Sequence, residues 1–248
     1  MPKERKINRK FHVKLTNGEE YSEKVSSSRL LSWELAWENW SQLKDEKILE
    51  IGPRYSRWPL RKQLQLNNCE YYSITAGKSE LRRKNVVHPP EGKITSPGNF
   101  FTATDRLTDH FEEEFFDRII GIESFEHWGH QIGKRIEGYP RDGEEAYRVG
   151  IEQCSKILKK GGWFEQEVPI QSHGEGYFVY ELWEDLEKNF PKDTWSEMQI
   201  IEKGRPEGYT AVEACKHTER INPDAAPPYT TLRCSDCCWN AMLRWQRI

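Results

Sequence analysis

Short apolar runs that end abruptly at turn-forming residues constrain the fold of this chain more than any other feature. The segments 47–52 and 115–122 are almost continuously apolar, which is typical of strands covered on both faces of a sheet. Helical patterns separate these runs. Such an alternation predicts a parallel α/β sheet that binds ligands at the carboxyl ends of its strands.

The same criteria extend over the chain and predict a seven-stranded sheet with helices on both faces. The expected strands are 47–52, 69–75, 100–105, 115–122, 163–170, 198–202 and 209–215. The expected helices are 29–40, 57–66, 147–158 and 179–190, with the glycines Gly161 and Gly162 ending the third.

The helix at 29–40 carries a stripe of large side chains behind a serine cap at 26–28. Leu30, Trp33, Trp37 and Trp40 recur at helical spacing and form one face. This stripe either lines the mouth of a substrate site or packs in the core, and core packing is the simpler interpretation.

Charge and hydropathy exclude several classes of protein. The 248 residues include 37 Lys and Arg and 40 Asp and Glu, so no basic surplus points to a nucleic-acid binder. Only the first ten residues are locally basic, which predicts a solvated tail or, alternatively, an arm for an anionic partner. We find no apolar run that could span a membrane and no signal peptide, so we expect a cytoplasmic protein.

Three segments, taken in order, resemble the class I S-adenosylmethionine-dependent methyltransferases. They are Ile48–Pro53, Phe116–His127 and Cys154–Phe164, and the resemblance spans residues 44–217. It implies a mostly parallel, Rossmann-like methyltransferase sandwich. The expected organisation is a tail and aromatic helix at 1–43, a methyltransferase-like domain at 44–217, and a Cys-rich extension at 218–248 packed on that domain.

The resemblance implies that the loop after the first strand of this domain binds S-adenosylmethionine. Glu50 would organise the loop, and Gly52 would let the backbone approach the cofactor because glycine has no Cβ. Pro53 continues the motif. The further loop glycines of the family are replaced here by Arg54 and Ser56. Arg54 either contacts the cofactor carboxylate or points to solvent.

Three more residues are implied to contact the cofactor. Thr75 stands where the family usually places an acid for the ribose hydroxyls, and its hydroxyl can make one such bond. Asp105 would receive the adenine amino group, unless it is a surface turn residue. Glu123 follows the fourth strand, at the floor between cofactor and substrate.

Two histidines are candidates for the general base. His127 matches the histidine of the family's Glu-His pair, and Glu126 or Glu123 could orient it. The alternative for His127 is a structural hydrogen bond. His173 follows the fifth strand at the same sheet edge and is the second candidate.

The predicted function is methyl transfer from S-adenosylmethionine to a small polar acceptor, such as a saccharide hydroxyl. The alternative is a non-catalytic binding or scaffold protein that retains the fold. The sequence lacks the Gly-x-Gly-x-x-Gly of nicotinamide enzymes. It predicts neither a nucleic-acid nor a membrane partner, and it does not indicate an oligomeric state.

The cysteines near the end of the chain raise the question of zinc. Cys215, His217, Cys234 and Cys237 have the residue types of a structural zinc site. However, 209–217 is also expected to be a strand of the sheet, where Cys215 and His217 would face the core. We therefore expect no metal.

Overall fold

The computed structural model describes residues 8–52, 59–75, 94–95, 107–109, 111–125, 143–171, 187–203 and 238–248. Its strands are β1 (Asn8–Lys14), β2 (Glu20–Ser26), β3 (Lys47–Ile51), β4 (Glu70–Thr75), β5 (Ile94–Thr95), β6 (Phe116–Ile122), β7 (Leu158–Gln171), β8 (Gln199–Lys203) and β9 (Cys238–Gln246). Its helices are α1 (Ser27–Trp40), α2 (Pro59–Leu66), the short 3-10 helix η1 (Leu107–Asp109) and α6 (Gly143–Ile157).

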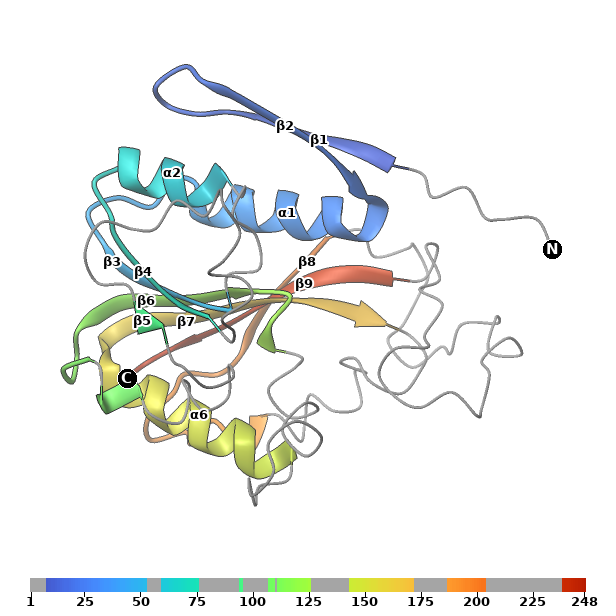
Figure 1. Cartoon of the computed structure of the whole chain (residues 1–248). Coiled ribbons are helices and arrows are strands. Elements are labelled where there is room, and N and C mark those ends of the chain that lie inside the picture. Colours follow the sequence, from blue (N-terminus) through green and yellow to red (C-terminus); the bar gives the residue numbers. More distant parts are fainter. Residues whose placement is uncertain are drawn as a thin grey trace, which may run out of the picture.

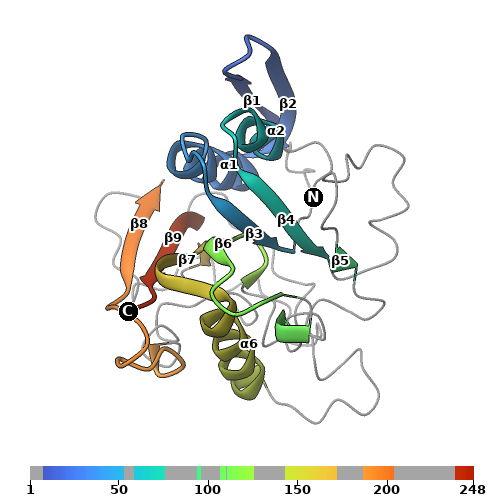
Figure 2. The same cartoon turned by 90° about the vertical axis from the view of Figure 1, so that its left-hand side faces the viewer.

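Seven of these strands form the central sheet, in the order β5-β4-β3-β6-β7-β9-β8 (Figure 2). The pairs from β5 to β7 are parallel, and β9 runs antiparallel to both of its neighbours. The predicted mostly parallel, seven-stranded α/β sheet is therefore confirmed.

The strand order reverses direction between β3 and β6. From β3 the chain proceeds to β4 and β5 on one side, and then returns to build β6 and β7 on the other. In open α/β sheets this reversal opens a crevice outside the carboxyl ends of the two strands, where ligands bind. The fold therefore points to the ends of β3 and β6 as the functional edge.

Helices cover both faces of the sheet (Figure 1): α1 and α2 lie on one face, and α6 lies on the other. Each face has its own apolar core. Under α1 and α2 the core includes Trp33, Ile48 and Ile120, and under α6 it includes Leu49, Ile119 and Phe164. Successive strand residues thus face opposite cores, which explains the continuous apolar runs in the sequence.

A β-hairpin of β1 and β2 forms an additional layer outside α1 (Figure 1). Its turn contains Asn17 and Gly18, whose φ of 89° is accessible to glycine. Phe11 is buried against Trp33 at 5.3 Å between ring centroids. The sequence prediction assigned the first ten residues to a tail and missed this hairpin, although Asn-Gly between apolar alternations is a strong hairpin signal.

The remaining differences concern element boundaries. Helix α6 ends at Ile157, and Gly161 and Gly162 lie within β7 instead of ending the helix. The strands predicted at 100–105 and 209–215, and most of the helix predicted at 179–190, lie outside the described residues. The strand beside β7 is β9, from the Cys-rich segment.

No helix within the described ranges is long and apolar enough to cross a membrane.

Candidate functional site

The end of β3 combines a left-handed glycine with a buried acid. Gly52 directly follows the strand and has a φ of 75°, a conformation that glycine adopts without steric cost. Glu50 lies two residues earlier and is 4% exposed. Its carboxylate is 4.0 Å from the guanidinium of Arg61 on α2. Glu50 thus links the strand before the loop 53–58 to the helix after it.

Arg61 is held from two sides. Its guanidinium lies over the ring of Tyr71 on β4, at 4.9 Å from the centroid. Burial lowers the pKa of Arg61, and the carboxylate of Glu50 partly offsets this effect. Together these contacts connect β3, α2 and β4 around the loop that follows Gly52.

The end of β6 has an unusual backbone conformation. Glu123 has a φ of 46°, which is uncommon for a residue with a side chain, and it is 3% exposed. Its backbone N–H donates to the carbonyl oxygen of Glu167 at 3.0 Å. The next residue, Ser124, donates its hydroxyl to the carbonyl oxygen of Ile51 at 2.9 Å, which joins the ends of β6 and β3.

A polar cluster lies beneath this edge, on the face covered by α1. Glu167 of β7 accepts hydrogen bonds from the Ser32 hydroxyl at 2.6 Å and from the Asn240 amide at 2.6 Å. Its Oε2 also lies 3.3 Å from the backbone nitrogen of Glu123, which donates to it. Burial and the nearby charge of Glu123 raise the pKa of Glu167 to about 8, against the opposing effect of the hydrogen bonds.

On the other face, Gln166 fills the space above Gly121. A Cβ on Gly121 would lie 2.2 Å from Gln166 Oε1 and 2.7 Å from the Ser124 hydroxyl. Gln166 is fully buried, and neither polar atom of its amide has a hydrogen-bond partner among the residues that the structure describes. A side chain at position 121 would therefore require the Gln166 and Ser124 side chains to move.

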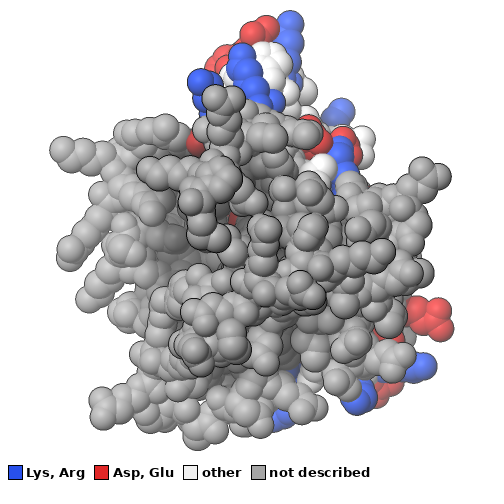
Figure 3. Space-filling view, turned by 90° about the vertical axis from the view of Figure 1, so that its right-hand side faces the viewer, with Lys and Arg blue, Asp and Glu red and all other residues white. Residues whose placement is uncertain are grey.

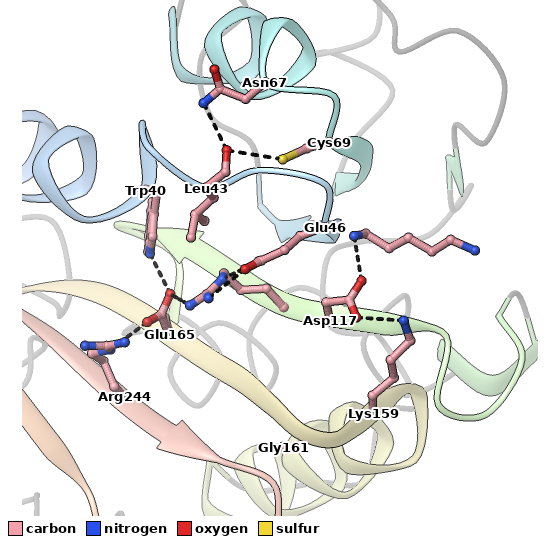
Figure 4. Close-up of polar contacts among 12 residues, drawn as sticks. Trp40, Leu43, Glu46, Asn67, Cys69, Asp117, Lys159, Gly161, Glu165 and Arg244 are labelled. Atoms are coloured by element: carbon pink, nitrogen blue, oxygen red, sulfur yellow. Dashed lines mark hydrogen bonds and ion pairs between the residues drawn. The ribbon is translucent and has the colours of Figure 1, made fainter.

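A second buried network lies further from the carboxyl edge (Figure 4). Glu165 accepts hydrogen bonds from Arg118 at 2.6 Å, Arg244 at 2.6 Å and the Trp40 indole at 2.8 Å. Arg118 also donates to both carboxylate oxygens of Glu46. Burial alone would lower the pKa of Arg118, but the two carboxylates outweigh it and raise the pKa. This network joins α1, β6, β7 and β9 and stabilises the fold.

The predicted cofactor residues that the structure describes gather at one edge. Gly52 and Thr75 end adjacent strands, since Ile51 pairs with Ile74 in the parallel register. Glu123 lies across β3 at the end of β6. The roles implied for these residues and for Glu50 stay predictions. The other predicted site residues lie outside the described residues: Pro53, Arg54, Asp105, Glu126, His127 and His173.

The sequence prediction missed Ser32, Glu167 and Asn240. A signal for Glu167 exists, because Glu165-Gln166-Glu167 interrupts an otherwise apolar strand with three polar residues, and buried charges in a strand need partners. The partners themselves could not be predicted, since they lie on α1 and β9, far from Glu167 in the sequence.

The described residues provide no metal centre. No group of three or more His, Cys, Asp or Glu side chains within them could hold a metal ion. Cys69 and Cys154 are buried free thiols, and burial raises the pKa of Cys154. The candidate zinc ligands Cys215, His217, Cys234 and Cys237 lie outside the described residues.

A scan against protein-family models and a search of curated proteins each gave no match. A S-adenosylmethionine-dependent methyltransferase from Archaeoglobus fulgidus has a similar structure, with a TM-score of 0.51, 9% identity, and coverage of 89% of this chain and 95% of its own. A methyltransferase from Pyrococcus furiosus has a TM-score of 0.49 at 14% identity, covering 90% of this chain and 83% of its own.

The N-methyltransferase NodS from Bradyrhizobium japonicum, solved with S-adenosylhomocysteine, has a TM-score of 0.49 at 13% identity, with coverage of 89% of this chain and 87% of its own. The similarity to the Archaeoglobus fulgidus structure, at 9% identity, concerns the fold alone. The strand order and the mixed sheet agree with it. The chain therefore has a Rossmann-like fold similar to that of an S-adenosylmethionine-dependent methyltransferase.

Proposed function

We propose that the protein binds S-adenosylmethionine at the ends of β3 and β6 and transfers its methyl group to a small polar acceptor. One observation carries the proposal: Gly52 and Glu123, both with positive φ, end the two strands at which the sheet order reverses. Backbone strain in a residue such as Glu123 is typical of functional sites.

The residues present at this edge fit the cofactor. Gly52 presents backbone without a Cβ, so that a ligand can approach closely. The pair of Glu50 and Arg61 fixes β3 and α2 on either side of the loop. Pro53, Arg54, Thr75 and Asp105 are proposed to complete the cofactor contacts, as the family resemblance implies.

The cofactor, when bound, supplies an activated methyl group. The chain then has to hold the acceptor in line with that group and to accept its proton. We assign the proton to His127, oriented by Glu126 or Glu123, with His173 as the second candidate. An acceptor that loses a proton on methylation, such as a saccharide hydroxyl, suits this arrangement.

The charge balance of the chain supports a small acceptor over a polyanion. Figure 3 shows the side of the molecule at the right of Figure 1, where the visible described Lys and Arg side chains are interspersed with Asp and Glu. The net charge of the chain is -3. Binding of a nucleic acid would call for basic side chains gathered on one face.

Calorimetric titration with S-adenosylhomocysteine tests the proposal. We expect saturable heat for one site and a ligand-dependent rise of the melting temperature. No heat and no thermal shift at millimolar ligand would rule out the enzyme and leave a non-catalytic scaffold with the same fold.

Substitution of Gly52 tests where the cofactor binds. Gly52→Val places a branched side chain at a left-handed position, so we expect binding of S-adenosylhomocysteine to be lost. Gly18→Val is the matched control, because Gly18 is also left-handed but lies in the hairpin turn with open space around it. If both variants bind equally well, the site is elsewhere.

The proposed base is tested by turnover. We expect His127→Ala to slow methyl transfer by about a hundredfold or more, the usual contribution of a general base, while the affinity for S-adenosylhomocysteine stays the same. Unchanged turnover would remove His127 from this role and direct the same test to His173.

A further inference from the structure

We propose that Glu167 is a positioning residue of this site: its carboxyl group, held by Ser32 and Asn240, fixes the backbone of Glu123 at the end of β6. The inference rests on the proposed function for its effect on ligand binding. The hydrogen bonding of Glu167 to the Glu123 backbone does not depend on a ligand.

Three elements that are distant in sequence meet at the Glu167 carboxyl group. Ser32 reaches it from α1 and Asn240 from β9, each at 2.6 Å. Oε2 then accepts the backbone N–H of Glu123 at 3.3 Å, while the main-chain oxygen of Glu167 accepts the same N–H at 3.0 Å. Glu123 is thereby held by two acceptors of one residue in a conformation that its own side chain disfavours.

Among the residues that the structure describes, Glu123 is the charged neighbour that acts on Glu167. On its own strand Glu165 is paired with Arg118 and with Arg244 of β9. Lys203 of β8 is paired with Glu34 and Glu38 of α1. Burial raises the pKa of Glu167, and the charge of Glu123, which directly follows β6, raises it further.

Ionisation of Glu167 would therefore add a second negative charge beside Glu123 inside the protein. Like charges at short range and low dielectric repel strongly. In the protonated form, the carboxyl group can donate to the Ser32 hydroxyl and still accept from Asn240 and Glu123. The protonated form is the one that preserves the arrangement at the end of β6.

This arrangement makes ligand binding dependent on pH. With a pKa of about 8, only about one molecule in ten keeps Glu167 protonated at about pH 9, and the apparent affinity falls by that fraction. A glutamine at this position cannot ionise, so Glu167→Gln removes the titration. Its oxygen can accept from Asn240 and its NH2 can donate to Ser32, but the NH2 cannot accept the Glu123 N–H as Oε2 does.

The experiment is calorimetry with S-adenosylhomocysteine at about pH 7 and about pH 9. We expect the wild type to bind about tenfold more weakly at the higher pH, and Glu167→Gln to bind equally at both. Glu165→Gln is the matched control, since it lies on the same strand and face but contacts Arg118 and Arg244 instead; it should retain the wild-type pH dependence. An identical pH dependence in wild type and Glu167→Gln would overturn the proposal.

Amide exchange of the Glu123 N–H provides a second readout that needs no ligand. We expect Ser32→Ala, which removes one of the bonds that hold Glu167, to lower the protection of this amide by about fivefold or more, the loss of about one hydrogen bond. Unchanged protection would overturn the positioning role even if S-adenosylhomocysteine binds. Lowered protection without any ligand binding would retain the positioning role and reject the proposed function.

Discussion

Two adjacent glycines in β7 are required for different reasons. Gly161 has a φ of 77° and open space where a Cβ would stand. At Gly162 a Cβ would lie 2.8 Å from the carbonyl oxygen of Lys159 and 2.9 Å from that of Asp117. Both obstacles are backbone atoms, which cannot rotate away. The first glycine is therefore needed for its conformation, and the second for the close approach of β6 and β7.

Alanine substitutions should separate these two requirements. Gly161→Ala is expected to lower the free energy of unfolding by about 1 kcal/mol, the cost of a left-handed residue with a side chain. Gly162→Ala should cost about 3 kcal/mol, because the strands must move apart. Urea unfolding of both variants measures the difference, and equal losses would contradict the assignment.

The buried Gln166 side chain is expected to lower the free energy of unfolding of the protein. Its amide is buried, and neither polar atom is hydrogen bonded within the described part of the chain. We expect Gln166→Met, which has a similar volume, to raise the free energy of unfolding by about 1 kcal/mol, since an unsatisfied buried group costs about that much or more. Thermal unfolding tests this, with Gln199→Met at an exposed position of β8 as control. A loss of stability would show that the Gln166 amide makes a favourable contact.

The predictability of the site also differs from residue to residue. Gly52 and Glu123 could be located from the sequence because strand, loop and helix follow one another locally. Glu167 could not, since its bonds to Ser32 and Asn240 join residues separated by 135 and 73 positions. Such pairings depend on which strands and helices are neighbours in space.

At the scale of elements, α1 is covered on two sides. The sheet lies beneath it and the hairpin above it (Figure 1). Trp40 donates to Glu165 on the sheet side, and Trp33 packs on Phe11 of the hairpin. The predicted core packing of the tryptophan stripe is confirmed for these two residues. Because the sequence prediction did not include the hairpin, it assigned only one buried face to α1.

The network around Arg118 joins these elements, so its removal should be costly. Arg118→Ala leaves Glu46 and Glu165 without their shared cation, and we expect a loss of about 3–5 kcal/mol. Lys156→Ala breaks an exposed ion pair with Glu152 and should change stability by less than about 0.5 kcal/mol. Denaturant unfolding compares the two, and similar losses would show that the buried network is not stabilising.

For the whole molecule, burial of Glu167 makes stability depend on pH. Its pKa is raised from 4.5 to about 8, so the folded state binds this proton more tightly than the unfolded state. This tighter binding stabilises the folded state. The stabilisation is complete below pH 4.5 and is lost as the pH rises to about 8, by about 1.4 kcal/mol per pH unit.

The difference between wild type and Glu167→Gln isolates this contribution, because all other titrating groups are common to both. Unfolding free energies measured across this pH range should show the variant gaining on the wild type as the pH increases. A constant difference would mean that Glu167 titrates normally in the folded protein.

The fold as a whole was more predictable than the position of its last strand. Parallel strands buried on both faces leave a local signature, and 47–52, 69–75 and 115–122 were found from it. The partner of β7 was not, since the choice between 209–215 and β9 depends on pairing across the sheet. Residues Trp239 to Trp245 alternate apolar and polar types only in part, so their pattern does not identify a strand with certainty.

The insertion of β9 between β7 and β8 has a consequence for synthesis of the protein on the ribosome. β8 is made first, yet in the described sheet it pairs with β9 alone, so it has no place to dock when it emerges. Until β9 follows, β7 is a long edge strand with free backbone donors and acceptors, which are a template for pairing with another chain. In the interval between the emergence of β8 and β9, a nascent chain is therefore exposed to pairing with other chains.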